Sequence, residues 1–456
     1  MSKIVRLTVI FVMLMALIPV STAQATPPPP DTCVKFDNPD NATEVYMICL
    51  PQNYSAWNGD LIVFAHGYVD TRQPVDIPYS ELVLSDGTTI PELVNNLNFA
   101  FATTSYGKNG LSVLEGVQDI LGLIQYFKSV YPTTQKVFVV GASEGGLVTT
   151  LLTEQYPSAI NGGLSLCGPV GDFVKQVNYW DDFRVVFDYF FPGLLAPTAI
   201  NIPAGLPEQW STYKTGSIGP YINVPVEQPG PLQDKVMNAI YNAPSSTIAQ
   251  LLNVTKAPKS ALDLTAKDPL KTTWATVRDL LWYNIMSTDE GRRELHHAPY
   301  TGNQGNPFNN KSPLRKYTGS KNDTLLNSKV KRFTAEPAAL TEMAKYQTSG
   351  ILTIPLVNMH TTLDPIVPFW HQTLYTNKVR AKGSTANYTS ISIGRYGHCS
   401  FYAAEMLLAF NRLLGNAGGA SMDTYLAALP NKASQERFKA LVQQLGQAQS
   451  VTVNDK

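Results

Sequence analysis

Short runs of apolar residues alternate along the first third of the chain with a segment whose apolar residues recur at helical spacing. Such runs are typical of strands buried on both faces of a sheet. Residues 113–127 have helical spacing, and Ser112 with Glu115 fits a capping box at their start. The alternation predicts an α/β fold with a mainly parallel sheet flanked by helices. Its first predicted strands are 61–65, 99–104, 136–140 and 162–167.

The alternation stops after the last of these strands. Residues 170–344 are rich in aromatics, proline and amides and lack regular strand alternation. We therefore expect an inserted, largely helical lid there. Strand-like runs resume at 351–360 and 388–393. The predicted organisation is a core in two parts, residues 26–169 and 345–456, with the lid subdomain 170–344 between them.

The first 25 residues, 1–25, have the make-up of a secretory signal peptide. Lys3 and Arg6 precede an apolar stretch over residues 7–20, and small residues that fit a signal-peptidase site follow it. A membrane anchor is the alternative, but the apolar stretch is shorter than the ~20 residues that a spanning helix needs. No other segment is long and apolar enough to span a membrane. We predict a secreted or periplasmic protein with no membrane span after signal cleavage.

Cysteine usage is consistent with export. Four cysteines permit three disulfide pairings, and sequence alone does not choose among them. Nearness in the chain favours Cys33 with Cys49, in which case Cys167 and Cys399 remain as the second pair.

A possible nucleophile lies between the strand 136–140 and a helix-like stretch. The residues there are Gly141-Ala142-Ser143-Glu144-Gly145, a Gly-x-Ser-x-Gly pattern. The pattern alone arises by chance in roughly one chain in ten of this length. Between a strand and a helix, however, it forms a sharp turn that exposes the serine hydroxyl. We therefore predict that Ser143 is a nucleophile.

A serine nucleophile needs a base, and the base needs a carboxylate that fixes its tautomer. Asp364 follows the strand-like run 351–360, and His398 follows the run 388–393. Both lie downstream of Ser143, in the chain order serine, acid, histidine. We predict that they are the acid and the base, with Asp172 as the alternative acid.

An acyl-transfer site also needs N–H donors for the oxyanion. The residue after the nucleophile supplies one, so we assign the backbone N–H of Glu144 and expect its side chain to face solvent. The second should come from the loop after the strand 61–65, where His66-Gly67-Tyr68 lies. We assign the N–H of Tyr68.

These positions together resemble a secreted α/β-hydrolase, a serine hydrolase of esterase or lipase type with an inserted lid. The resemblance implies a lid after the sixth core strand and the roles given above for Ser143, Asp364 and His398. A further similarity is to tannase and feruloyl-esterase-like enzymes, in which a cysteine beside the catalytic histidine is disulfide-bonded. Cys399 matches that position, but no cysteine adjoins Ser143. Cys167 is the expected partner because its strand should neighbour the strand of the nucleophile.

We predict hydrolysis of a carboxylic ester, in a small molecule or a polymer, through an acyl-enzyme. An alternative is a serine peptidase of prolyl-oligopeptidase-like type, since Gly146 extends the serine motif as in those enzymes. A hydrolase-fold binding protein without catalysis is a second alternative, disfavoured because no triad member is missing. Lys plus Arg and Asp plus Glu number 35 each, so no charge excess favours a nucleic-acid partner. No cofactor or metal is predicted, and the group Glu294, His296 and His297 lacks a convincing ligand spacing.

Overall fold

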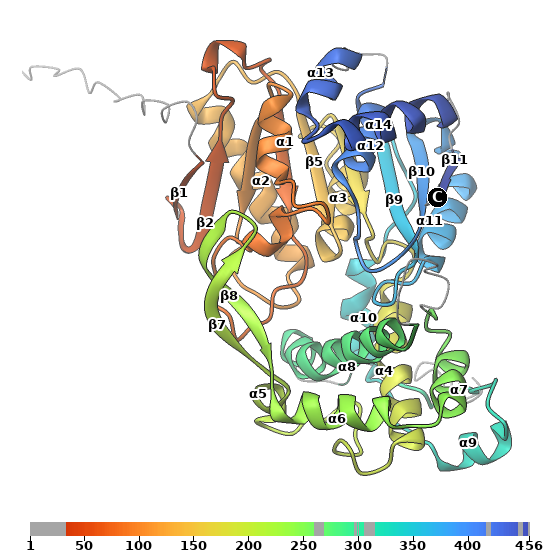
Figure 1. Ribbon diagram of the computed structural model, residues 1–456. Helices are drawn as coiled ribbons and strands as arrows, with labels where there is room; N and C mark the ends of the chain where they lie inside the picture. Colours follow the sequence, from red (N-terminus) through yellow and green to blue (C-terminus); the bar gives the residue numbers. More distant parts are fainter. Residues whose placement is uncertain are drawn as a thin grey trace, which may run out of the picture.

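The computed structural model describes residues 33–259, 269–295, 299, 301–304, 315–415, 421–445 and 450–454. The predicted signal peptide lies outside these residues. At the centre is a nine-stranded sheet in the order β1-β2-β4-β3-β5-β6-β9-β10-β11 (Figure 1). All neighbours from β4 to β11 pair in parallel, and β1 and β2 add an antiparallel edge, so the predicted mainly parallel sheet is confirmed. The strands are β1 (Val34–Asn38), β2 (Asn41–Cys49), β3 (Leu61–Ala65), β4 (Ala100–Thr104), β5 (Val137–Ala142), β6 (Gly162–Leu166), β9 (Leu356–Leu363), β10 (Tyr388–Tyr396) and β11 (Ser450–Asn454).

Helices cover both faces of the sheet because alternate strand residues point to opposite sides. On β3, Ile62 and Phe64 join the core beneath α1, α12 and α14, whereas Leu61 and Val63 join the core beneath α2, α3 and α11. The core helices are α1 (Ile90–Asn96), α2 (Val113–Val130), α3 (Glu144–Gln155), α11 (Trp370–Ala381), α12 (Ala403–Leu414), α13 (Met422–Ala428) and α14 (Lys432–Leu445).

Two local expectations were wrong. The strand predicted at 351–360 is β9, which begins later, at Leu356. Pro355 precedes it and has no N–H to pair, although its carbonyl accepts a hydrogen bond from Gly163. The capping box at Ser112 is absent, because the Ser112 hydroxyl donates backward to the carbonyl of Lys108 instead.

A second group of elements, here called the insertion, lies between β6 and β9 and has its own hydrophobic core. The β7–β8 hairpin within it was not expected from the sequence, because most of its side chains are exposed or half-buried and it contains no apolar run. The insertion comprises α4 (Phe173–Phe190), α5 (Leu206–Trp210), β7 (Ser211–Ile218), β8 (Tyr221–Pro229), α6 (Pro231–Tyr241), α7 (Ser245–Thr255), α8 (Pro269–Glu294), α9 (Asp323–Lys329) and α10 (Pro337–Met343).

The insertion is attached to the core just after β9. The Trp180 indole and the Gln176 amide, both on α4, donate to the carbonyl of Ile366, and the Tyr179 hydroxyl donates to that of Pro365. In Figure 1 the helices α4, α6, α7 and α8 form a layer below the sheet, at one end of its strands. Among the described residues, no helix has both the length and the apolar character that crossing a membrane requires.

Candidate active site

Ser143 lies on a sharp turn between β5 and α3. Its backbone has φ 55° and ψ −121°, a conformation that costs free energy for a residue with a side chain. The flanking glycines permit the turn. A Cβ on Gly141 would lie 2.1 Å from the carbonyl oxygen of Gly145, and one on Gly145 would lie 2.0 Å from that of Ala65. The turn therefore needs glycine at both positions, and it presents the serine hydroxyl beyond the end of the strand.

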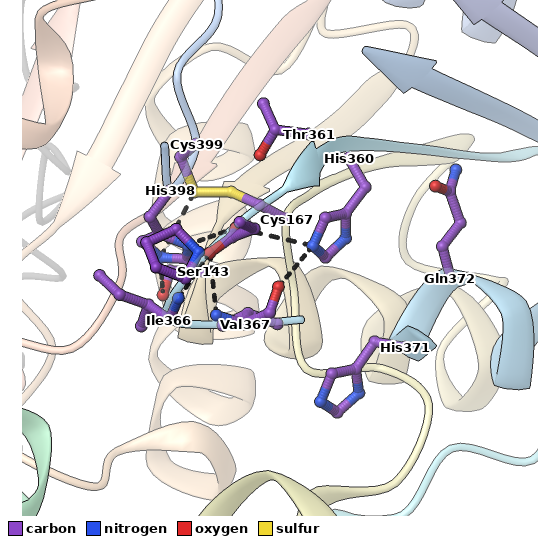
Figure 2. A network of polar contacts seen from close by, with 12 residues as sticks. Ser143, Cys167, His360, Thr361, Ile366, Val367, His371, Gln372, His398 and Cys399 are labelled. Atoms are coloured by element: carbon purple, nitrogen blue, oxygen red, sulfur yellow. Dashed lines mark hydrogen bonds and ion pairs between the residues drawn. A yellow bond between two sulfur atoms is a disulfide. The ribbon is translucent and has the colours of Figure 1, made fainter. Parts of the chain in front are cut away.

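The structure brings Ser143, His398 and Asp364 together, and Figure 2 shows Ser143 beside His398. His398 Nε2 lies 2.8 Å from Ser143 Oγ, and His398 Nδ1 lies 2.7 Å from Asp364 Oδ2. The other carboxylate oxygen of Asp364 accepts the N–H groups of Ile366 at 2.8 Å and Val367 at 2.9 Å. A buried carboxylate held in this way makes Nδ1 the protonated nitrogen, so Nε2 is free to accept the serine proton.

Asp172, the alternative acid, has a different role. It is the N-cap of α4, where its Oδ1 accepts the N–H of Lys175 at 3.1 Å. The same oxygen accepts the side-chain amide of Gln347 at 3.2 Å. Its contacts are those of a helix cap.

His360 lies beside the carboxylate of Asp364. Its Nε2 donates to the carbonyl of Val367 at 2.8 Å and lies 3.6 Å from Asp364 Oδ2. Burial lowers the pKa of His360, so the ring is neutral near pH 7. His371, by contrast, is set apart from the cluster in Figure 2. Its Nε2 donates to Gln176 at 2.7 Å, which attaches the insertion to α11.

The loop after β3 lies against Ser143. A Cβ on Gly67 would lie 3.1 Å from the Cβ of Ser143. Three contacts hold the loop: the Tyr106 hydroxyl donates to the carbonyl of His66 at 3.1 Å, His66 Nδ1 donates to that of Gly67 at 2.7 Å, and the Gly67 N–H donates to Glu81 Oε2 at 2.5 Å. Burial raises the pKa of Glu81 to about 7. The sequence carried no signal for Glu81, because it lies outside every motif.

The side chain of Glu144 does not face solvent, as had been expected. It is buried, and its Oε1 accepts the N–H of Ser112 at 2.8 Å. Burial, together with the nearby carboxyl of Glu290 on α8, raises the pKa of Glu144 well above its usual range. Glu290 itself accepts the N–H of Leu111 at 3.0 Å. The expectation failed because it ignored the segment 107–112 and α8, which cover this side chain.

Two disulfides are present. Cys33 is bonded to Cys49 and Cys167 to Cys399. The second bridge ties the residue after β6 to the residue after His398, so it constrains the loop that carries His398. The described residues contain one cluster with metal-ligand geometry, formed by Cys167, His398 and Cys399, and its two sulfurs are already bonded to each other. His296 and His297 lie outside the described residues.

Known proteins that are similar to this chain were found by structure and not by sequence. No family model matches it, and no curated protein matches it by sequence. It is similar to the structure of feruloyl esterase B from Aspergillus oryzae, at 13% identity and a TM-score of 0.42, over 81% of this chain and 78% of that one. It is also similar to the structure of an esterase from Aspergillus oryzae, at 14% identity and a TM-score of 0.42, over 78% of this chain and 70% of that one. A third similar structure is the acylaminoacyl peptidase of Pyrococcus horikoshii, at 11% identity and a TM-score of 0.41, over 87% of this chain and 44% of that one. The chain therefore spans less than half of that peptidase.

The sheet order and the strand-turn-helix that carries Ser143 are those of an α/β-hydrolase fold. A fold does not determine a substrate, so the chemistry depends on the geometry of the site itself.

Proposed function

We propose that this protein is an exported serine hydrolase that cleaves carboxylic esters, with Ser143 as nucleophile, His398 as base and Asp364 as acid. The observation that carries the proposal is the continuous pair of contacts at 2.8 Å and 2.7 Å from the Ser143 hydroxyl through the imidazole to the buried carboxylate. The strained backbone of Ser143 supports it further, since strain of this kind gathers at functional positions.

In the proposed mechanism the Ser143 oxygen attacks the ester carbonyl carbon as its proton passes to His398 Nε2. The oxyanion is stabilised by the N–H groups of Glu144 and Tyr68. His398 then donates its proton to the leaving alcohol as the bond between the acyl carbon and the alcohol oxygen breaks. Water, deprotonated by the same imidazole, releases the acid from Ser143.

The preference for an ester is supported by aromatic side chains around the nucleophile. Tyr68, Trp180 and Tyr283 line a cavity that reaches Ser143, and ligand sites are commonly lined in this way, with few polar groups. Gly146 does not favour the peptidase alternative, because packing accounts for it. A Cβ there would lie 2.9 Å from the carbonyl oxygen of Leu166.

Two further parts of the proposal concern organisation and location. We propose that the insertion is the lid of the site, since Trp180 and Tyr283 of its helices α4 and α8 line that cavity. Export is supported by the two disulfides, because such bonds persist mainly in oxidising compartments.

The test compares wild type with Ser143→Ala on matched p-nitrophenyl esters and on dipeptide and prolyl p-nitroanilides. We expect ester turnover that disappears in the variant while its circular dichroism and melting temperature stay close to wild type. Turnover of anilides alone would support the peptidase alternative. Near-full ester turnover in a clean Ser143→Ala preparation would contradict the assignment of the nucleophile.

A further inference from the structure

Two cavities meet at Ser143, and they differ in size. The smaller has a volume of about 30 Å³ and lies between Ser143 and the insertion. The larger has a volume of about 320 Å³ and lies on the side of His398. Tyr68 and Tyr283 border both cavities and so form the wall between them.

The proposed mechanism assigns one part of the substrate to each cavity. The leaving alcohol must receive its proton from His398, so it has to lie on the side of the imidazole. His398 lines the larger cavity and not the smaller one. Glu144, whose N–H is a proposed oxyanion donor, lines the smaller cavity and not the larger. The acyl group therefore extends into the smaller cavity, and the alcohol occupies the larger.

Aromatic side chains of the insertion line the smaller cavity. Trp180 of α4 and Tyr283 of α8 stack with their ring centroids 4.7 Å apart and an interplanar angle of 20°. The Trp180 indole is also fixed by a hydrogen bond to the carbonyl of Ile366 at 3.0 Å. Val177, about one turn of α4 earlier, and Phe173, about two turns earlier, complete an apolar wall. The space open to the centre of a water-sized probe is two to three times the ~10–15 Å³ that a single water molecule requires, which suits a short acyl chain.

The larger cavity has two kinds of wall. Ser80, Glu81 and Ser85 contribute polar groups, whereas Phe64, Ile90 and Met406 contribute apolar surface. An alcohol that fills this space has to be several times larger than a methyl group and to carry both hydroxyl-like and apolar parts.

From this division we infer that the enzyme is selective for short acyl groups on large amphipathic alcohols. The inference rests on the proposed function. Trp180 and Tyr283 are then the residues that determine acyl length. Adding methylenes to a filled, well-packed site costs ~1–3 kcal/mol, which corresponds to a roughly 5- to 150-fold loss in kcat/KM.

The experiment measures kcat/KM for p-nitrophenyl acetate, butyrate and octanoate, which share one leaving group, with the spontaneous rate subtracted. We expect acetate and butyrate to exceed octanoate by at least about tenfold. In Trp180→Ala the ratio of octanoate to acetate should rise by about tenfold or more, because the variant widens the small cavity. Trp274→Ala is the matched control: Trp274 lies on α8, does not line either cavity, and its replacement should leave the ratio unchanged.

The alcohol side is tested with acetate esters of methanol and of 2-phenylethanol, and we expect the larger alcohol to be preferred. A wild-type profile that is flat or rises with chain length, yet vanishes in Ser143→Ala, would overturn the inference about acyl length and leave the hydrolase in place. Ester turnover that survives in Ser143→Ala would instead refute the proposed function. The wild-type profile needs no variant, so a misfolded Trp180→Ala would not remove the test.

Discussion

Glu81 is expected to position the oxyanion loop, and replacing it tests how that loop is held. Its Oε2 accepts the Gly67 N–H at 2.5 Å, next to the peptide that carries the proposed Tyr68 donor. Leucine has nearly the same volume but no acceptor, so Glu81→Leu leaves a part-buried N–H unsatisfied, at a cost of ~1–3 kcal/mol. The loop can relieve that cost by turning the Gly67 N–H toward another acceptor, which moves the Tyr68 N–H away from the oxyanion.

The size of the effect follows from what an oxyanion donor contributes. Losing one donor entirely lowers kcat by roughly 10²- to 10³-fold. For a donor that is displaced and not deleted, we expect Glu81→Leu to lower kcat by about 10- to 100-fold with a smaller change in KM, since the donor acts mainly in the transition state. Glu81→Gln keeps a carbonyl acceptor and should stay within a few-fold of wild type. Steady-state kinetics on p-nitrophenyl acetate measure both variants.

The titration of Glu81 gives a second test, in which stability is measured against pH. Burial raises the pKa of Glu81 from its usual 4.5 to about 7 in the folded protein. The folded state therefore holds this proton more tightly, and the contribution of Glu81 to stability is present below pH 4.5 and is lost as the pH rises through 7. Glutamine does not titrate, so the free energy of unfolding of Glu81→Gln should gain on wild type between about pH 4.5 and 7. Equal kcat in the leucine and glutamine variants would refute the positioning argument, and a pH-independent stability difference would refute the burial argument.

Two predictions concern other parts of the site. Asp364→Asn should lower kcat by roughly 10³- to 10⁴-fold with the fold intact, because asparagine no longer holds His398 in the tautomer that accepts the serine proton. Steady-state kinetics measure the loss of kcat, and circular dichroism checks the fold. A loss of kcat under tenfold would contradict this prediction. Removing the Cys167–Cys399 bridge, which closes 232 residues, should cost up to ~5 kcal/mol in the chain-entropy model and lower kcat by loosening the His398 loop. Denaturant unfolding and kinetics of the double alanine variant check both effects, and unchanged activity would show that the bridge does not constrain the base.

Local sequence patterns were informative where the residues that form a feature are contiguous in the chain. The turn at Ser143 needs only a strand, two small residues and a helix that are contiguous in the chain, so it was recognisable from five residues. Asp364 and His398 were recognisable for a related reason. In a parallel sheet the carboxyl ends of the strands lie at one edge, so residues that follow β9 and β10 meet the residue that follows β5.

Among the strands that were missed, β1, β7 and β8 share a physical cause, whereas β2 was missed although its residues 45–49 form an apolar run. The hairpin β7–β8 and the edge strand β1 are partly exposed on both faces, so no apolar run marks them in the sequence. Their formation depends on pairing with a partner strand and on packing against the core. The ring contact between Tyr221 of β8 and Tyr79, with centroids 4.6 Å apart, is one such contact.

By itself, the sequence determined the alternating core, because short-range periodicity marks the buried strands of the sheet. The roles predicted for Ser143, Asp364 and His398, and the predicted division of the chain around a lid, rest on the residues beside strand ends and on composition, and they remain predictions. Only the tertiary structure decided the surroundings of the site. Glu81 meets Gly67 across 14 residues, Glu290 meets Leu111 across 179, and Trp180 and Tyr283 line the small cavity from separate helices. Such contacts depend on how the insertion packs onto the sheet, and no local pattern encodes that packing.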